Sequence, residues 1–408
     1  MKTHCAGTYP GIIPRLVIGE SGSRPLTLDE ELALGTYAPV AVDGLIDEIE
    51  LAGLRGRGGS GFPAHVKWRA VRAGAGPRVV VANGEEGEPS SLKDRWLLTN
   101  RPHAVIDGLL IAAAAVGAER CVLYLSHGET VRAVNAALAE WPSVVSSVEV
   151  HQVSPRYVAG EESAACRSIN GGPALPLAKP PRPFESGVDG RPTLVANVET
   201  LAHATWIARH GAQRYREFGT TSSPGTTLVT LSGACCRPGV YEVPFGLTLS
   251  EVVRVCAEGP SGEISGVLSG GWFNGVSRAS LLDVTWCFDA VRAEGTGVGC
   301  GAVTLLGDDE PVVEVVARLA RWYANESSHQ CGVCDKGTVA IADALALDRD
   351  EGASLESRTN LTRWGTSLRG RGACAFLDGA ANLAKSYVDW VVKEPTKDLV
   401  SACEKEGR

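Results

Sequence analysis

The sequence predicts a chain of three parts: an α/β domain with a largely parallel sheet, a small β-rich domain and a C-terminal helical bundle. Three observations predict it. Strand-like and helix-like segments alternate from residue 78 to about 215, strand signals dominate from there to about 308, and apolar residues then recur at helical spacing. Because 408 residues are too many for one ordinary core, we place the parts at 1–222, 223–308 and 309–408.

The first part begins with a helix predicted over "VDGLIDEIELAGL", which ends at Gly53, and continues with alternating elements. The predicted strands are "RVVVAN", "RCVLYLS" and "SVEVHQV", the helices between them are "HAVIDGLLIAAAAVGA" and "ETVRAVNAALAEW", and further helices start near 161 and 198. Ligands bind at the carboxyl ends of the strands of such a sheet. Three polar motifs fall at strand ends: "NGEEGEPSSLKDR", "YVAGEESAACRS" and "NVETLA".

The stretch "GLRGRGGSGFPAHVKW", residues 53–68, is rich in glycine and in positive charge. Its glycines satisfy G-x-G-x-x-G, but that dinucleotide fingerprint needs a strand before it, and here a helix precedes it. Glycines let a backbone approach a planar or phosphorylated ligand closely, and Arg57 and Lys67 supply positive charge. From these residues alone, a ligand-binding loop and a tight surface turn are both open.

The second part starts with "TTLVTLSGACCRPGVYEVPFGLTLSEVV", which predicts two strands, a turn through "RPG" and a helix beginning at Thr248 or Ser250. In the third part, "PVVEVVARLARWYANES" carries apolar residues at helical spacing, and "TVAIADALALD", "LTRWGTSL" and "AANLAKSYVDWVVKE" continue the pattern. These segments predict the helical bundle.

Three cysteines of the bundle form a pattern that carries chemistry. Cys331 and Cys334 make a C-x-x-C between two predicted helices, and Cys374 precedes the last helix. Free buried thiols, a zinc site with His329 as the fourth ligand and an iron-sulfur site are all open; loops at helix N-termini would stabilise the negative charge of a cluster. Cys235 and Cys236, in the β-rich part, are interpreted as free thiols.

Composition limits the partners and the location. The net charge is −8 with no compensating basic stripe, which disfavours nucleic acid. No run of 18 apolar residues is present, which argues against membrane insertion, and the first residues lack the apolar segment of a secretion signal. We therefore expect a cytoplasmic protein whose twelve cysteines are thiols or metal ligands and whose partner is a small cofactor or another protein.

Read together, the motifs resemble one family, the flavoprotein subunit of respiratory complex I and its relatives in NAD-reducing hydrogenases and formate dehydrogenases. The resemblance covers about residues 40–395 and rests on eight motifs in the family's order: the glycine loop, "NGEEGEPSSLKDR", "YVAGEESA", "KPPRP", "NVET", "LSGACCRPGVYEVPFG", "ES-x-x-x-CGVC" and "CAFLDGAA". It implies that the first domain binds FMN and receives NADH, that the β-rich domain is ubiquitin-like (a β-grasp fold of the SLBB type), and that the bundle carries a 4Fe-4S cluster.

The resemblance also implies roles for particular residues. FMN is expected against Gly56, Arg57, Gly58 and Lys67, with Asn83, Glu85, Glu86, Glu161, Glu162, Asn197 and Thr200 around its phosphate, ribityl chain and ring. NADH is expected at Phe62, Glu88 and Lys179, with Glu162 shared near the nicotinamide, which makes Glu88 and Glu162 the predicted catalytic residues. The predicted cluster positions are Cys331, Cys334, Cys374 and Ser328.

Four departures from the family pattern qualify these roles. Glu85 replaces an Asp, and Ala196 precedes Asn197 where the family usually has Asn. Two ring positions that hold adenine in the family are Ala70 and Arg182 here, which predicts weak NADH binding and leaves NADPH as a possible competitor. Ser328 stands where the family's first cluster cysteine would be, so we expect an incomplete iron-sulfur site.

The leading hypothesis is an FMN-dependent NAD(P)H oxidoreductase. It takes hydride onto flavin and passes single electrons to a ferredoxin-like or 2Fe-2S protein or to a partner subunit. One alternative is a non-catalytic flavin-binding or scaffold relative with a degraded cluster site, which bleaching of the flavin by NADH would exclude. The other is a flavin-free protein stabilised by zinc, which elemental analysis would decide.

Overall fold

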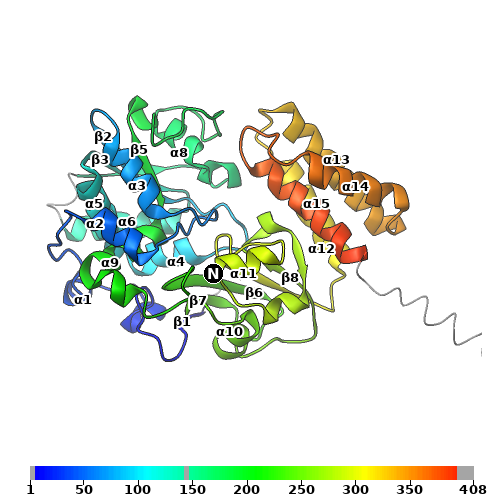
Figure 1. Cartoon of the computed structure of the whole chain (residues 1–408), viewed down its shortest axis with the longest axis horizontal. Coiled ribbons are helices and arrows are strands. Elements are labelled where there is room, and N and C mark those ends of the chain that lie inside the picture. Colours follow the sequence, from blue (N-terminus) through cyan, green and yellow to red (C-terminus); the bar gives the residue numbers. More distant parts are fainter. Residues whose placement is uncertain (1–4, 142–146, 393–408) are drawn as a thin grey trace, which may run out of the picture.

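Four parallel strands form the sheet of the first part, in the order β4-β3-β2-β5. The computed structural model describes residues 5–141 and 147–392 (Figure 1). The strands are β2 (Arg78–Gly84), β3 (Ala118–Leu125), β4 (Val148–Gln152) and β5 (Thr193–Asn197). The positions of β2, β3 and β4 agree with the predicted strands, β5 was not predicted, and the all-parallel pairing confirms the predicted sheet.

Helices cover both faces of this sheet, which explains the continuous apolar run of β2. Val80 and Ala82 face a large core shared with most of the helices, whereas Val79 and Val81 face a smaller core that includes Cys166 of α8. The helices of this part are α1 (Leu28–Ala33), α2 (Leu45–Ala52), α3 (Ala64–Ala73), α4 (Lys93–Asn100), α5 (Pro102–Val116), α6 (Gly128–Glu140), α8 (Glu162–Ile169) and α9 (Val198–Tyr215), with short 3-10 turns η1 (Gly19–Gly22), η2 (Tyr157–Gly160) and η3 (Val188–Gly190).

The second part is built on a mixed sheet of six strands in the order β1-β7-β6-β10-β8-β9. Its elements are β6 (Thr226–Gly233), β7 (Gly239–Pro244), α10 (Leu249–Cys256), β8 (Ile264–Ser269), η4 (Trp272–Asn274), β9 (Val276–Arg278), η5 (Ala279–Asp283), α11 (Phe288–Ala293) and β10 (Ala302–Gly307). Thr248 caps α10 by accepting the N–H of Glu251, so the predicted helix start is confirmed.

The edge strand β1 (Cys5–Thr8) comes from the beginning of the chain and pairs in parallel with β7. A few residues further on, the backbone N–H groups of Arg15, Leu16 and Val17 donate to the buried carboxylate of Glu242, at 2.9 to 3.0 Å. The N-terminal segment therefore belongs in part to the second sheet, an arrangement that the sequence patterns do not predict.

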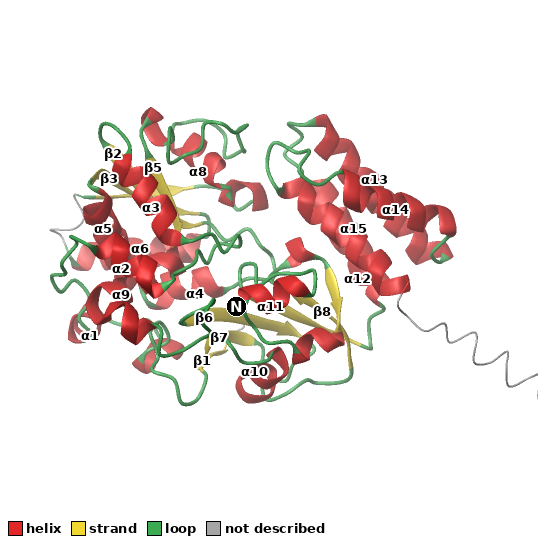
Figure 2. Cartoon of the chain, in the orientation of Figure 1, coloured by secondary structure: helices red, strands yellow, loops and turns green. Residues whose placement is uncertain are grey.

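The third part is a bundle of four helices, α12 (Val312–Glu326), α13 (Gly332–Glu351), α14 (Leu355–Ser367) and α15 (Phe376–Val392). The helices lie beside the six-stranded sheet, as Figure 2 shows. The apolar core of the bundle includes Leu268 and Val276 of that sheet, so the second and third parts share a core. Among the described helices, none combines the length and the apolar composition needed to cross a bilayer.

Candidate functional site

The glycine-rich loop joins α2 to α3 and is closed on itself. Gly53 ends α2 in a left-handed conformation, with φ 70°, as the sequence predicts. The Gly56 N–H donates to the carbonyl of Phe62 at 2.8 Å, and the Ala64 N–H donates to that of Leu54 at 2.9 Å. A Cβ on Gly58 would lie 3.3 Å from the Cβ of Asn197, so this loop passes directly over the end of β5.

Two predicted asparagines meet at the same edge of the parallel sheet. Asn83 and Asn197 are register partners at the carboxyl ends of β2 and β5. Asn83 donates from Nδ2 to the carbonyl of Gly160 at 2.9 Å, while Asn197 caps α9 by accepting the Glu199 N–H at 3.0 Å. The glycine loop, the two strand ends and the turn before α8 therefore surround one place, where parallel α/β sheets bind ligands.

Four charged side chains form a cluster beside this edge: Lys67, Glu161, Glu162 and Lys179. Glu162 accepts from Lys67 at 2.7 Å and from Lys179 at 3.3 Å, and Lys179 also contacts Glu161. Burial disfavours the ionised form of Glu162, but the two ammonium groups outweigh it, so the pKa of Glu162 is lowered. The cluster presents paired charges that are 19–32% exposed, which a phosphate or a carboxamide can reach.

Arg57 lies in a different environment from Lys67. Its backbone N–H donates to Thr200 Oγ1 at 2.9 Å, and its guanidinium bonds Tyr215 and the carbonyl of Thr226 at 3.2 and 3.1 Å. Glu199 Oε1 lies 3.7 Å from Arg57 Nε, and both side chains are buried. The guanidinium is therefore held inside the protein, whereas the Lys67 side chain is partly exposed.

The three glutamates of "NGEEGEPSSLKDR" have three different roles. Glu86 caps α4, accepting the N–H groups of Asp94 and Arg95 at 3.0 Å. Glu85 is buried and accepts the Gly87 N–H at 3.1 Å; burial raises its pKa to about 8. A Cβ on Gly160 would lie 2.5 Å from Glu85 Oε2, so a larger residue at this position would displace the Glu85 carboxylate.

Glu88, one of the two predicted catalytic residues, contacts the second domain. Its carboxylate accepts the Ser90 hydroxyl at 2.7 Å and the backbone N–H of Trp272, in η4, at 3.1 Å. Burial raises its pKa to about 7. Glu162, the other predicted catalytic residue, lies in the charge cluster, so the structure separates the two into different hydrogen-bond networks.

Sequence reasoning missed a buried network beneath the asparagine of β5. Lys93 Nζ lies 2.7 Å from Asp94 Oδ1 and 3.0 Å from Glu199 Oε2, and Asp94 accepts the Asn197 amide at 2.6 Å. Burial would lower the pKa of Lys93, but the two carboxylates raise it above its ordinary value, so Lys93 stays charged. Lys93 and Asp94 both lie in the motif "NGEEGEPSSLKDR". Two charged residues immediately before the apolar part of a helix could have indicated a buried ion pair.

The cysteine-bearing loops of the bundle lie next to the charge cluster. Cys331 occupies the N-cap position of α13, Cys334 lies in its first turn, and Cys374 precedes α15. Burial raises the pKa of Cys334 to about 11, and the nearby Cys331 and Cys374 thiols add to this effect. Burial likewise raises the pKa of Cys374, with smaller contributions that include Glu161 and Cys331. The three thiols are thus within electrostatic range of one another.

The residues around these thiols fit an iron-sulfur cluster only in part. Three thiols at helix starts suit a cluster, but the fourth predicted position is Ser328, and the His329 ring bonds Asp335 at 2.6 Å. Within residues 5–141 and 147–392, no three His, Cys, Asp or Glu side chains are arranged to hold a single metal ion. A cluster of four irons spaces its ligands farther apart than one zinc ion does.

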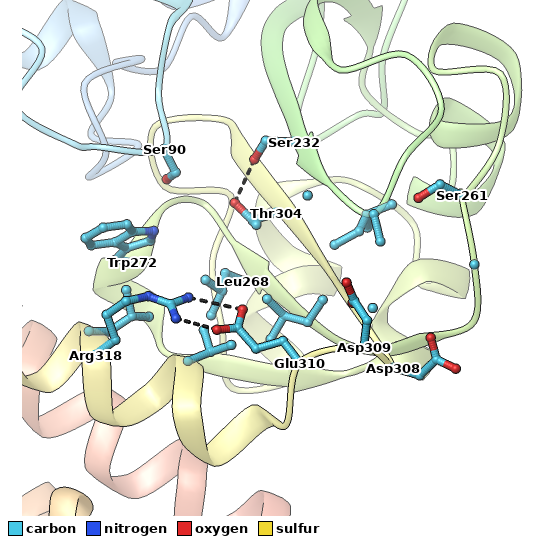
Figure 3. Close-up of a pocket in the computed structure, with 18 residues that line it drawn as sticks. Ser90, Ser232, Ser261, Leu268, Trp272, Thr304, Asp308, Asp309, Glu310 and Arg318 are labelled. Carbon is cyan, nitrogen blue, oxygen red and sulfur yellow. Dashed lines mark hydrogen bonds and ion pairs between the residues drawn. The ribbon is translucent and has the colours of Figure 1, made fainter.

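Two cavities lie outside the glycine loop. One, of about 370 Å³, adjoins α3 on the same helix as Lys67 and is lined by Ala70, Phe184 and Glu185, together with Ala73, Gly74, Ala75, Gly190 and Pro192. The other, of about 650 Å³, lies between the second sheet and α12. Figure 3 shows Trp272 and Ser90 at one end of it and Asp308 and Asp309 towards the other, with Arg318 paired to Glu310.

The fold and the site define an α/β domain with a candidate ligand site at its sheet edge, joined to a cysteine-bearing bundle. Residues 49–206 match the family model described as the Nuo51 FMN-binding domain, and residues 314–394 match the NADH-ubiquinone oxidoreductase-F iron-sulfur binding region. The chain belongs to the family of F subunits of NADH-quinone oxidoreductase. This confirms the predicted resemblance and, at the level of the family, the predicted cofactors FMN, NADH and an iron-sulfur cluster.

The relatives support this membership over most of the chain. The second F subunit of the NADH-quinone oxidoreductase of Rhizobium meliloti (strain 1021) is 35% identical over 370 residues, which is 86% of each protein. The F subunit of the Streptomyces coelicolor (strain A3(2)) enzyme is 32% identical, over 84% of this chain and 80% of that protein. The air-oxidised NAD+-reducing [NiFe]-hydrogenase matches with a TM-score of 0.81 and 31% identity, over 91% of this chain and 66% of that one, just under two thirds of its length.

Proposed function

We propose that this chain is the FMN-dependent subunit of an NADH-oxidising assembly. When bound, FMN would accept a hydride from NADH, which would leave as NAD+, and would pass the two electrons singly to an iron-sulfur partner while the proton goes to water. The observation that carries the proposal is the convergence of the glycine loop, the strand-end asparagines and the Lys67 cluster at one sheet edge, within the region that matches an FMN-binding domain.

In this proposal the chain's own residues bind and orient the flavin. The loop at Gly56 and Gly58 lets the backbone come close, and Lys67 supplies a positive charge to the phosphate. Asn197 Nδ2 donates one of its two hydrogens to Asp94, which leaves the other for a flavin or ribityl oxygen. Asn83 has the same spare hydrogen after its bond to Gly160.

For the nicotinamide coenzyme we propose a site along the exposed side of α3, leading from Lys67 to the cavity at Ala70. Phe62, which is 43% exposed, Glu162 and Lys179 would hold the reactive half. Phe184 supplies a ring in the cavity where Ala70 provides none, and the carboxylate of Glu185 disfavours a 2′-phosphate while accepting a ribose hydroxyl. The proposed coenzyme is therefore NADH rather than NADPH.

This coenzyme assignment is testable with truncated coenzymes. Phe184→Leu should raise the KM for NADH and leave that for reduced nicotinamide mononucleotide, which lacks adenosine, unchanged. Glu185→Gln keeps an acceptor for the backbone N–H of Arg182, which Glu185 accepts at 2.8 Å. This variant should raise kcat/KM for NADPH relative to that for NADH. Equal effects of Phe184→Leu on both reductants, or an unaltered NADPH to NADH ratio in Glu185→Gln, would refute the assignment.

Several finer features of the proposal remain to be tested by experiment. We propose that the second part is a ubiquitin-like domain of the SLBB type, consistent with α10 packing beside a mixed sheet, and that the domains are 1–222, 223–308 and 309–408, the extreme ends of which lie outside the described residues. We propose a 2Fe-2S or ferredoxin-like partner and a cytoplasmic location. Pull-down of the partner from the native host with the expressed chain tests the first proposal, and fractionation of the native host tests the second.

A non-catalytic flavin-binding relative is the competing function, favoured by Ser328 in the cluster site. Anaerobic addition of NADH to the yellow protein separates the two. Bleaching of the flavin absorbance within seconds supports the oxidoreductase. A protein that retains its flavin and its folded circular dichroism spectrum but stays yellow in excess NADH would support the scaffold. The same sample, analysed for iron and sulfide, reports the state of the cluster site.

A further inference from the structure

The cysteine-bearing end of the bundle touches the flavin domain through an ion pair between Arg156 and Glu326, through apolar packing of Val158 and Leu175, and at two further points. One point is an aromatic contact at η2, the turn that immediately precedes Glu161 and α8. The other is a hydrogen-bonded contact at Gln330, the residue before Cys331. Figure 1 shows the loops around α8 facing the near ends of α13 and α15. Each point joins a segment next to the proposed flavin site to a segment next to a cluster cysteine.

The aromatic contact is a cluster of rings. The ring of Tyr157 meets Trp322 of α12 edge-on, with centroids 5.3 Å apart at 90°, and Phe376 of α15 at 5.6 Å and 60°. Trp322 in turn meets Trp272 of η4 edge-on at 5.0 Å. Rings from all three parts of the chain therefore pack together, and edge-to-face packing of this kind fixes orientation as well as distance. Phe376 is two residues from Cys374.

The hydrogen-bonded contact is a clamp that uses both ends of one amide. Gln330 Nε2 donates to the carbonyl of Pro176 at 3.0 Å, and Gln330 Oε1 accepts from Arg167 of α8 at 3.0 Å. Arg167 and Pro176 belong to the segment that carries Glu161, Glu162 and Lys179. The clamp thus ties the loop of Ser328 and Cys331 to the segment that holds the charge cluster.

We propose that Tyr157, Trp322, Phe376 and Gln330 form a brace that sets the separation between the flavin site and the cysteine loops. The brace is proposed to act through position, so its members are positioning residues. This inference rests on the proposed function, because the separation matters only if electrons pass from flavin to cluster. Electron transfer between fixed centres weakens steeply with distance, so a loosened brace slows that step and leaves hydride transfer unaffected.

Substitutions on the bundle side test the brace without altering the flavin domain. Trp322→Leu removes the ring between Tyr157 and Trp272, Gln330→Ala removes the clamp, and Trp322→Phe restores a ring. Trp364→Leu is the matched control, because Trp364 packs against the core of the bundle from α14 and makes no described ring contact with the other two parts. All four variants are compared with wild type as purified, with flavin bound and with iron content measured.

Two readouts are needed. In hydrogen exchange, amides of residues 156–160 and 328–332 should exchange faster in Trp322→Leu and Gln330→Ala than in wild type, whereas Trp322→Phe and Trp364→Leu should match it. In stopped flow, NADH should reduce the flavin at an unchanged rate, while transfer to the iron-sulfur acceptor should become several-fold slower.

The outcomes separate the brace from the function on which it rests. If NADH cannot reduce the flavin of the wild-type protein, the proposed function is refuted. The hydrogen-exchange data would then still test whether the four residues hold the bundle against the flavin domain. Unchanged exchange in Trp322→Leu and Gln330→Ala, or equal slowing in Trp364→Leu, would overturn the brace. The brace would also be overturned if slower reduction of the flavin by NADH accounted for the whole loss of electron transfer to the iron-sulfur acceptor.

Discussion

Replacing Glu85 by Gln should make the folded chain more stable at neutral and alkaline pH. Glu85 is buried at the end of β2, with one carboxylate oxygen accepting the Gly87 N–H and the other lacking a hydrogen-bond partner within the described residues. Burial raises its pKa to about 8 from an ordinary 4.5. Gln has the shape of the protonated acid and does not ionise, so the variant never has to bury a charge.

The sign and the size of the effect follow from this pKa. Between pH 4.5 and about 8 the folded chain holds the Glu85 proton and the unfolded chain releases it, so wild-type stability falls as the pH rises through that window. The pKa of Glu85 differs by about 3.5 units between the folded and the unfolded chain. At 1.36 kcal/mol per unit, this lowers the free energy of unfolding of the wild type by about 5 kcal/mol above pH 8. At pH 7, about 2.5 units give about 3 kcal/mol, and below pH 4.5 the effect vanishes.

The assay is urea unfolding of the cofactor-free chain at three pH values, near 5, 7 and 8.5. Glu85→Gln should gain stability over wild type progressively, with an unchanged dependence on urea concentration. Glu294→Gln, in an exposed loop, is the control and should track wild type at every pH. A gap between Glu85→Gln and wild type that does not widen as the pH rises would refute the reasoning, because then burial does not hold the proton on Glu85.

Three further predictions concern charge and the cluster site. Lys67→Ala should raise the Kd for FMN about tenfold to a hundredfold, since a hydrogen bond to a charged group is worth about 1.5–3 kcal/mol, and Lys67→Arg should retain most of the affinity in a fluorescence titration. Ser328→Cys should raise iron and sulfide content towards that of a full 4Fe-4S cluster and strengthen the reduced-state EPR signal; a wild-type protein that already holds such a cluster in air contradicts this. Arg57→Ala should lower the free energy of unfolding by about 3–5 kcal/mol by leaving Glu199 short of a partner, with Arg57→Lys intermediate; an unchanged urea midpoint in Arg57→Ala would count against the buried pair.

The elements that the sequence predicts well are those with strong local signals. The run "RVVVAN" is apolar throughout because β2 is covered on both faces, and its flanking polar residues mark the strand end. The glycine loop is predictable as a loop because its first glycine, Gly53, ends a predicted helix, as the structure confirms; its role in ligand binding stays a prediction. The strand-end asparagines follow from the rule that parallel strands end together, and Asn83 and Asn197 are indeed register partners.

What the sequence could not predict depends on partners far away along the chain. Arg57 reads as a free positive charge, but its partners Glu199, Tyr215 and Thr226 are supplied by α9 and β6, more than a hundred residues later. The glutamates of "NGEEGE" are nearly adjacent, yet the direction of each side chain is set by the turns of the loop, which residue type does not determine. The strand "CAGT" carries little strand propensity and forms only because β7 is available.

The pairing of β1 with β7 has a consequence for the order of events on the ribosome. Residues 5–8 pair with a strand that starts at Gly239, which the ribosome makes some 230 residues after them. At the usual 5–20 residues per second this is a wait of about 10 to 50 seconds, during which the first strand has no edge to join. The α/β sheet, complete by residue 197, can form in that interval. The nascent chain must therefore hold β1 unpaired until β7 has been made, and only then can the second sheet take it up.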